Sequence, residues 1–275
     1  MIVDYHMHLR RPGDGVEEID HTVEAVERFV EVAKARGVDE IGFTEHVYYF
    51  RQTRELWTQP YYTDRCTYDL DTYCDAVLEA KRRGLPVKLA LEVDYVPGRE
   101  RETHDILAPY PWDFLLGSVH EIEGHAIDQE PGLWQYFPIA EVWRRYFIAL
   151  RGAVRSGLFD VLSHPDLVKI YGRRPSAEDV LLHHEETADA IEAAGGLAIE
   201  ISTAGLRKPV GELYPDPAFL EACRTRGIPV TTASDAHLPD DVGRDLDQAV
   251  ALARDAGYST VTVFDGRRPR QEPLG

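Results

Sequence analysis

The sequence predicts an α/β fold in which parallel strands close into a barrel that helices cover. Apolar runs rich in Val, Ile and Leu recur along the whole chain, as expected for strands that are buried on both faces. Amphipathic helical stretches separate most of these runs, and a glycine follows each helical stretch. Seven or eight strand–helix units in one chain favour a closed barrel, and an open doubly wound sheet is the alternative.

The predicted elements alternate in the order that this fold requires. The strands are expected at residues 2–6, 40–46, 87–93, 113–120, 160–164, 197–202, 229–235 and 260–264. The helices are expected at residues 17–36, 70–83, 139–156, 176–194, 216–226 and 243–256. In the first helical range, Ile19, Val23, Val26 and Val30 recur every three or four residues, which places them on one helix face.

Length and composition indicate one domain, over residues 1–265, followed by a flexible tail at 266–275. The net charge of −18 disfavours a nucleic acid or an anionic membrane as a partner. Three scattered cysteines without a CxxC pair argue against a disulfide framework or a thiolate zinc site, and they favour a reducing, cytoplasmic location. No apolar run approaches the length of a membrane span.

Three loops are longer than their connections require, and all three leave the carboxyl ends of predicted strands. They are residues 47–69, 94–112 and 121–138. Active sites of barrels lie at this end, so each loop is a candidate substrate lid or pocket wall. In the first loop, Tyr48, Tyr49 and Phe50 either stack on a substrate ring or pack in the core.

Potential metal ligands stand at the end of nearly every predicted strand. In "DYHMH", His6 and His8 are two residues apart and therefore point to the same side of a strand. Later strand ends carry Glu45 with His46, Glu92, His120, His164, and Asp235 with His237. Because parallel strands bring their carboxyl ends to one rim, these side chains should converge. Histidines and carboxylates without cysteine suit Zn²⁺, Mn²⁺ or Fe²⁺.

These motifs, in this order, resemble those of the polymerase-and-histidinol-phosphatase (PHP) superfamily of metal phosphoesterases. They read "DYHMH", "FTEH", "LALEVDY", "GSVHEIEGHAID", "DVLSHPD" and "ASDAH", and they span residues 4–237. The resemblance implies a distorted seven-stranded (βα) TIM-like barrel of the PHP type, with residues 260–264 outside or beside the barrel. It also implies three bound divalent metal ions.

The resemblance assigns a ligand set to each metal. The first set is His6, His8, Glu92 and Asp235, and the second is Glu92 as a bridge with His120 and His164. The third set is His46 and His237, completed by Asp14, with Glu45 and His21 as rivals for that place. In supporting roles, Glu45 would hold the surroundings of His46, and Asp4 would orient a histidine of the first strand.

The stretch "EISTAGLRKPVGELYP" at residues 200–215 resembles the corresponding part of histidinol-phosphate phosphatases. It implies hydrolysis of a small phosphorylated metabolite, L-histidinol phosphate, in histidine biosynthesis. Arg207 would bind the phosphate, with Lys208 as a weaker candidate and Lys169, Arg173 and Arg174 as alternatives. Asp235 or His237 would pass a proton to the leaving alkoxide.

Other functions remain open at this point. The same metals could serve another phosphoester, such as a nucleotide, an oligonucleotide or phosphotyrosine, or the chain could be a metal-binding scaffold without activity. A metal-dependent amidohydrolase would need a different order of ligands. The oligomeric state is not indicated. Of the remaining histidines, His125 is expected in a plain loop, and His183 and His184 on the surface of a helix.

Overall fold

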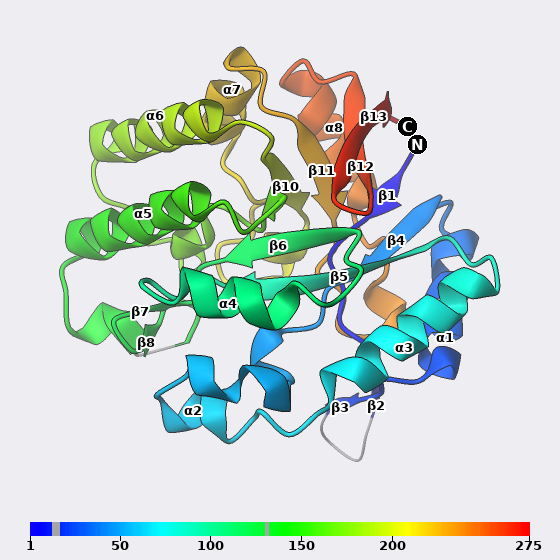
Figure 1. Ribbon diagram of the computed structural model, residues 1–275. Coiled ribbons are helices and arrows are strands. Elements are labelled where there is room, and N and C mark those ends of the chain that lie inside the picture. Colours follow the sequence, from blue (N-terminus) through cyan, green and yellow to red (C-terminus); the bar gives the residue numbers. More distant parts are fainter. Residues whose placement is uncertain (13–16, 130–131) are drawn as a thin grey trace.

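Seven parallel strands form the central sheet, in the order in which they occur along the chain (Figure 1). The computed structural model describes residues 1–12, 17–129 and 132–275, so Asp14 lies outside the described residues. The strands are β1 (Val3–Asp4), β4 (Glu40–Phe43), β5 (Val87–Asp94), β6 (Phe114–Ser118), β9 (Val161–Leu162), β10 (Ala198–Ser202) and β11 (Val230–Ala233). All six pairings within this sheet are parallel.

The last strand of the sheet returns to the first. The backbone N–H of Tyr5 donates to the carbonyl of Thr232 at 3.1 Å, and that of His8 donates to the carbonyl of Ala236 at 2.8 Å. Met7 and Ala236 form a parallel bridge just beyond the ends of β1 and β11. The sheet is therefore a nearly closed barrel, which confirms the predicted fold class and excludes the open doubly wound sheet.

The predicted helices cover the outside of the barrel. They are α1 (Val23–Ala35), α3 (Leu70–Arg82), α5 (Ile139–Ser156), α6 (Ala177–Ala194), α7 (Pro217–Thr225) and α8 (Leu246–Asp255). The first begins later than predicted, because the Thr22 side chain caps it by accepting from the backbone N–H of Ala25. Residues 17–19 instead form β3 (Glu17–Ile19), which pairs with β2 (Arg10–Pro12). Within the described ranges, no helix combines the length and the apolar character that a membrane span requires.

The long loops contain short elements of their own. They include α2 (Pro60–Thr63), α4 (Glu100–Leu107) and the hairpin of β7 (Glu121–Ile122) and β8 (His125–Ala126). Short 3₁₀ helices lie at Val47–Tyr49, Arg51–Leu56, Gly132–Gln135, Leu167–Lys169, Ala204–Arg207 and Pro239–Asp241. These elements build walls beyond the carboxyl ends of the strands.

The C-terminal segment is ordered rather than flexible, which corrects the prediction for residues 266–275. β12 (Thr260–Asp265) and β13 (Arg268–Pro273) form an antiparallel hairpin outside the seven-stranded sheet. Apolar side chains of β12, including Phe264, pack with Tyr5 and Phe114 of the barrel in one buried cluster. The N-terminal ammonium group donates to the carbonyl of Pro273 at 2.6 Å, and the two termini lie side by side in Figure 1.

Candidate active site

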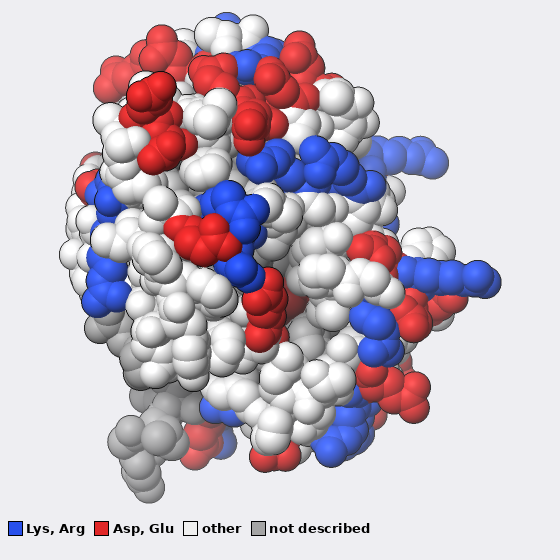
Figure 2. Space-filling view, turned by 90° about the vertical axis from the view of Figure 1, so that its left-hand side faces the viewer, with Lys and Arg blue, Asp and Glu red and all other residues white. Residues whose placement is uncertain are grey.

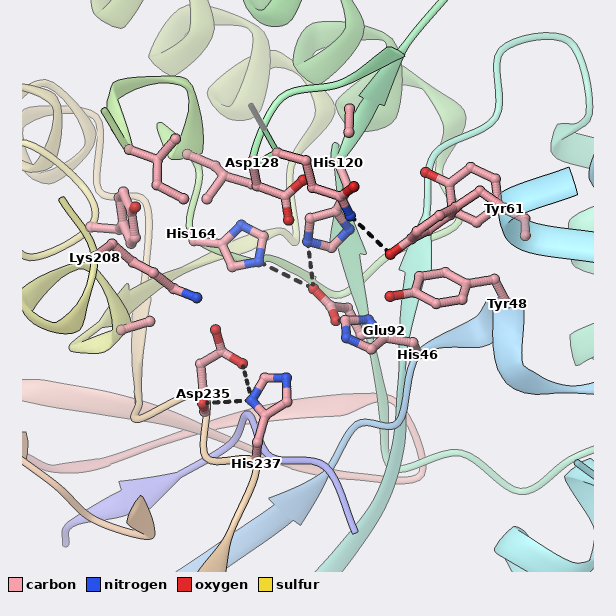
Figure 3. A pocket seen from close by; sticks show the side chains of 17 residues that line it. His46, Tyr48, Tyr61, Glu92, His120, Asp128, His164, Lys208, Asp235 and His237 are labelled. Atoms are coloured by element: carbon pink, nitrogen blue, oxygen red, sulfur yellow. Dashed lines mark hydrogen bonds and ion pairs between the residues drawn. The ribbon is translucent and has the colours of Figure 1, made fainter. Parts of the chain in front are cut away.

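The predicted ligands meet at the carboxyl ends of the barrel strands. His6, His120, His164 and Asp235 each follow a strand of the sheet by two residues, at the point where regular pairing stops. Glu92 lies within β5, and His46 forms a parallel bridge with it. His164 and Asp235 have positive φ values of 24° and 55°, so the backbone turns sharply at both of these residues. The predicted convergence on one rim is confirmed (Figure 3).

Glu92 is at the centre of the site, with histidines on both carboxylate oxygens. Its Oε2 lies 2.6 Å from Nδ1 of His46 and 3.4 Å from Nε2 of His6. Its Oε1 lies 3.1 Å from Nε2 of His164 and 3.4 Å from Nε2 of His120. The side chain is completely buried. A carboxylate placed between two sets of histidines has the geometry of a bridging ligand.

Asp235 forms the second acidic point of the site. Its Oδ1 lies 3.6 Å from Nε2 of His6 and 3.4 Å from Nε2 of His8. Nδ1 of His237 is 3.7 Å from the same oxygen. The two histidines of "DYHMH" therefore face one carboxylate together, as their spacing predicts.

Among the described residues, four groups of three side chains have ligand atoms within 4.8 Å of one another. The groups are His8–His46–His237, His6–His8–Asp235, His6–Glu92–His164 and His46–Glu92–His120. Several of these buried atoms, among them Nε2 of His6, Nε2 of His8 and Oε2 of Glu92, make no hydrogen bond within the described part of the chain. Buried polar atoms normally have partners, and divalent cations would satisfy all of these at once. The residues therefore fit divalent metal ions.

A layer of carboxylates behind the site orients the histidines. Nδ1 of His6 lies 2.9 Å from Glu200, Nδ1 of His8 lies 3.2 Å from Glu45, and Nδ1 of His120 lies 2.7 Å from Asp94. When the Nδ1–H group donates a hydrogen bond to the carboxylate, Nε2 carries no proton, and its lone pair can bind a metal at the centre of the site. Glu200 and Asp94 are absent from the predicted site. Glu200 could have been found from the sequence, because it is the one acidic residue in the apolar run "LAIEIS", and a charged group in a buried strand needs a partner.

Of the two predicted supporting acids, Glu45 lies where it was expected and Asp4 does not. Glu45 accepts from the backbone N–H of His46 at 3.1 Å, and its Oε1 also lies 3.2 Å from Nδ1 of His8. Asp4 does not hold a histidine: it accepts from the backbone N–H and the hydroxyl of Ser234, at 2.7 and 2.5 Å. It therefore holds the segment before Asp235. His21 lies 3.4 Å from Glu45 and belongs to none of the four groups.

The charges of the metal-free site act differently on different ligands. Despite burial, neighbouring acids raise the pKa of His6 and His8, and they raise that of His120 to about 10, so these histidines would release protons on binding a metal. Burial alone would raise the pKa of Glu92, but the neighbouring histidines, His46 first, hold it well below its ordinary value. Burial and the neighbouring His8 hold the pKa of His237 well below its ordinary value. Glu92 is therefore ionised and His237 neutral near neutral pH, and these are the forms that bind a metal.

A cavity of about 100 Å³ opens onto the cluster. Its lining includes Tyr48, Tyr61 and Tyr62 from the first long loop, and Asp128 and Gln129 from the third. Loop 94–112, the second candidate wall, contributes no residue to the described lining. Phe50 is buried in the core rather than facing a substrate, and Tyr49 packs with Arg10.

The predicted phosphate-binding arginine is not in the cavity. Arg207 is absent from the described lining, and its Nη2 donates to the carbonyls of Ser234 at 2.6 Å and Asp235 at 3.3 Å. Lys208, the weaker candidate, lines the cavity and extends toward the cluster in Figure 3. Arg207 thus donates hydrogen bonds to two carbonyl groups that have left the regular pairing of the sheet. The motif alone does not show which of the two adjacent cations, Arg207 or Lys208, makes these hydrogen bonds.

The alternative cations also lie elsewhere. Lys169 is completely buried beside Asp166, at 3.0 Å, and Arg174 pairs with Glu212 at 2.5 Å. The guanidinium of Arg173 lies over the ring of Trp134, with 5.3 Å between the carbon and the ring centroid. None of the three belongs to the described cavity lining.

The histidine pair of α6 is buried, which corrects the prediction of surface positions. His183 stacks on Phe147 of α5, with 5.1 Å between ring centroids, and His184 stacks on Phe219 of α7 at 4.8 Å. Because α6 packs against both α5 and α7, more of its surface is buried than its apolar residues alone indicate. The ring of His125, on β8, lies against that of Tyr136 at an interplanar angle of 40°, and His125 is not part of the described lining.

Comparisons with known proteins agree with this site. The PHP domain family matches residues 4–204, and the PHP-associated family matches residues 220–245. A Deinococcus radiodurans protein named "Probable histidinol-phosphatase" is 33% identical over 266 residues, which are 95% of this chain and 96% of that protein. The Lactococcus lactis protein named "Histidinol-phosphatase" is 24% identical over 275 residues, which cover 97% of this chain and 95% of that protein.

A solved structure shares the fold. The histidinol phosphate phosphatase of Lactococcus lactis, in complex with zinc, L-histidinol and phosphate, aligns with a TM-score of 0.73. The two chains are 22% identical, and the alignment covers 98% of each. At this level of identity the likeness concerns the barrel architecture.

Proposed function

Because the chain belongs to the PHP domain family, we propose that it is a metal-dependent phosphomonoesterase that hydrolyses L-histidinol phosphate to L-histidinol and phosphate. In the cell, this reaction would serve histidine biosynthesis. The observation that carries the proposal is the buried carboxylate of Glu92 with five histidines within 3.8 Å of its two oxygens, at the floor of a cavity. The named relatives support the choice of substrate.

We assign the ligands to three divalent cations, of zinc, manganese or iron. The assignment is His6, His8, Glu92 and Asp235 for the first, Glu92, His120 and His164 for the second, and His46, His237 and Asp14 for the third. The group His6–His8–Asp235 supports the first set, and His8–His46–His237 supports the pairing of His46 with His237. For the second set, His164 and His120 each share a group with Glu92, but no group contains both histidines. Bound cations would supply positive charge toward the phosphate oxygens and make water a better nucleophile.

The chain's own residues would then act on the phosphoester. The ammonium group of Lys208 would offset phosphate charge as the P–O bond to the alkoxide breaks. Asp235 or His237 would relay to the departing alkoxide the proton that the attacking water gives up, since both line the cavity. Arg207 would keep the carbonyls of Ser234 and Asp235 in place and so position the acidic side chain.

The experiment that tests this function is phosphate release by the purified, metal-loaded protein across a panel of phosphoesters. The panel contains L-histidinol phosphate, a nucleoside monophosphate, a short oligonucleotide and phosphotyrosine. The largest kcat/KM is expected for L-histidinol phosphate. A larger value for another member would overturn the substrate, and bound metal without turnover of any member would indicate a scaffold.

A further inference from the structure

The cavity contains a carboxylate that the metal cluster does not use. Asp128 lines the cavity, but it belongs to none of the four groups of ligand atoms. Its carboxylate makes no hydrogen bond or ion pair with the residues that the structure describes. A phosphate group alone would be repelled by this side chain, so its place in a phosphate-binding cavity calls for a positive partner.

The backbone around Asp128 is held firmly. The carbonyl of Asp128 accepts from the hydroxyl of Tyr171 at 2.7 Å. The adjacent Ile127 donates its N–H to the carbonyl of His120 at 2.8 Å, and its own carbonyl accepts from the indole of Trp134 at 2.9 Å. A carboxylate on a backbone fixed at these points is preorganised and loses little freedom when it binds a ligand.

The charged groups of Lys208 and Asp128, which make no hydrogen bond or ion pair within the described part of the chain, come from different walls of the cavity. Lys208 follows β10 in the chain and Asp128 follows β8. In Figure 3 the two side chains enter from different sides, with His164 between them. The tyrosine wall, with Tyr61 accepting from the Nε2 amide of Gln129 at 2.9 Å, closes the side next to Asp128. A ligand that suits this cavity carries a phosphate at the cluster and Lys208, and a cationic group a few bonds away.

We propose that Asp128 is the specificity-determining residue that binds the ammonium group of an amine-bearing phosphate monoester. The proposal rests on the proposed function, because L-histidinol phosphate has its amine on the carbon next to the phosphorylated CH₂. Asp128 would favour amine-bearing phosphate monoesters over nucleotides and phosphotyrosine peptides. A phosphate monoester without a nearby amine would leave the Asp128 carboxylate desolvated and without a positive partner.

The test compares two substrates in wild type and Asp128→Asn. One substrate is L-histidinol phosphate, and the other is 3-(imidazol-4-yl)propyl phosphate, which keeps the ring and the primary alkoxide but lacks the amine. The substitution should lower kcat/KM for L-histidinol phosphate by about 10- to 100-fold, as expected for a lost hydrogen bond between charged groups. It should leave kcat/KM for the analogue within about twofold, because the analogue makes no contact that depends on the charge of Asp128.

Each other outcome decides against the proposal. Equal losses on both substrates would make Asp128 a proton donor or a structural residue, and metal content, measured in parallel, separates those two. No loss on either substrate would also overturn it. Asp75→Asn, on an exposed position of α3, is the matched control and should change neither value. If wild type itself hydrolyses other phosphoesters but not L-histidinol phosphate, the proposed function fails instead.

Discussion

At the scale of single residues, the site is a set of histidines whose orientation depends on acids behind them. His6 illustrates the arrangement: its Nε2 faces Glu92, and its Nδ1 is held by Glu200. Glu200 also accepts from the backbone N–H of His164, at 3.1 Å, so one buried acid supports two ligands. Loss of such an outer partner typically weakens metal binding by 10- to 100-fold.

Glu200→Gln should therefore reduce metal affinity by about 10- to 100-fold while the protein stays folded. The amide can still accept from the N–H of His164, but the charge that holds the Nδ1 proton of His6 is lost. Competition with a chelator, read by metal content, measures the affinity. The exposed Glu185→Gln on α6 is the control, and equal affinities in the two variants would show that Glu200 does not support the ligand.

The residues that the sequence predicted best are those with a fixed place relative to a strand end. His6, His8, His46, Glu92 and His164 could be placed because strand periodicity and parallel topology determine where such side chains point. The outer acids and the cations could not, because their partners are backbone groups or come from distant loops. Arg207 and Lys208 are adjacent, and only the turn at Ala204–Arg207 decides which of them faces the cavity.

At the scale of elements, the C-terminal hairpin and α6 depart furthest from prediction. The side chains of β13 are mostly exposed, so the strand has no apolar alternation for the sequence to reveal. Its partner β12 places Val261, Val263 and Phe264 in the cluster with Tyr5 and Phe114. The hairpin therefore stabilises the amino end of the barrel, opposite the site.

Phe264→Ala should lower the free energy of unfolding by about 3–5 kcal/mol, because it removes a buried ring and leaves a cavity. Urea unfolding followed by circular dichroism measures the change. Tyr136→Ala, at a side chain that is 54% exposed, should change the free energy by less than about 0.5 kcal/mol. A small loss at Phe264 would mean that the hairpin does not contribute to the core.

The packing of α6 predicts a loss of stability in acid. Burial lowers the pKa of His184, and neither ring nitrogen has a hydrogen-bond partner within the described residues. Below about pH 6.5 the unfolded chain takes up a proton at this residue more readily than the folded chain does. The contribution of His184 to the free energy of unfolding therefore falls as the pH is lowered below about 6.5, by up to about 1.4 kcal/mol for each pH unit.

His184→Leu removes this titration. The free energy of unfolding of wild type minus that of the variant should fall as the pH is lowered from 7 to 5.5, in urea titrations at several pH values. Because other groups titrate equally in both proteins, the difference isolates His184. A difference that does not change with pH would show that His184 is protonated in the folded chain as easily as in the unfolded one.

At the scale of the whole molecule, the position of the site follows from the topology of the barrel. Parallel strands in chain order bring residues from His6 to His237 to one end of the barrel, although they are far apart in sequence. The net charge of the chain is −18, and acidic and basic side chains are interspersed on the face in Figure 2. The strand–helix alternation and the convergence could be predicted from periodicity and topology, and the seven-stranded barrel from the resemblance to the PHP superfamily.

The most direct test of the central claim is a metal titration of chelator-treated protein, with phosphate release from L-histidinol phosphate as the signal. The cluster around Glu92 predicts negligible turnover without metal and recovery as zinc, manganese or iron is added, and it predicts no recovery in Glu92→Gln. Full turnover by metal-free wild type, or normal recovery in Glu92→Gln, would contradict it.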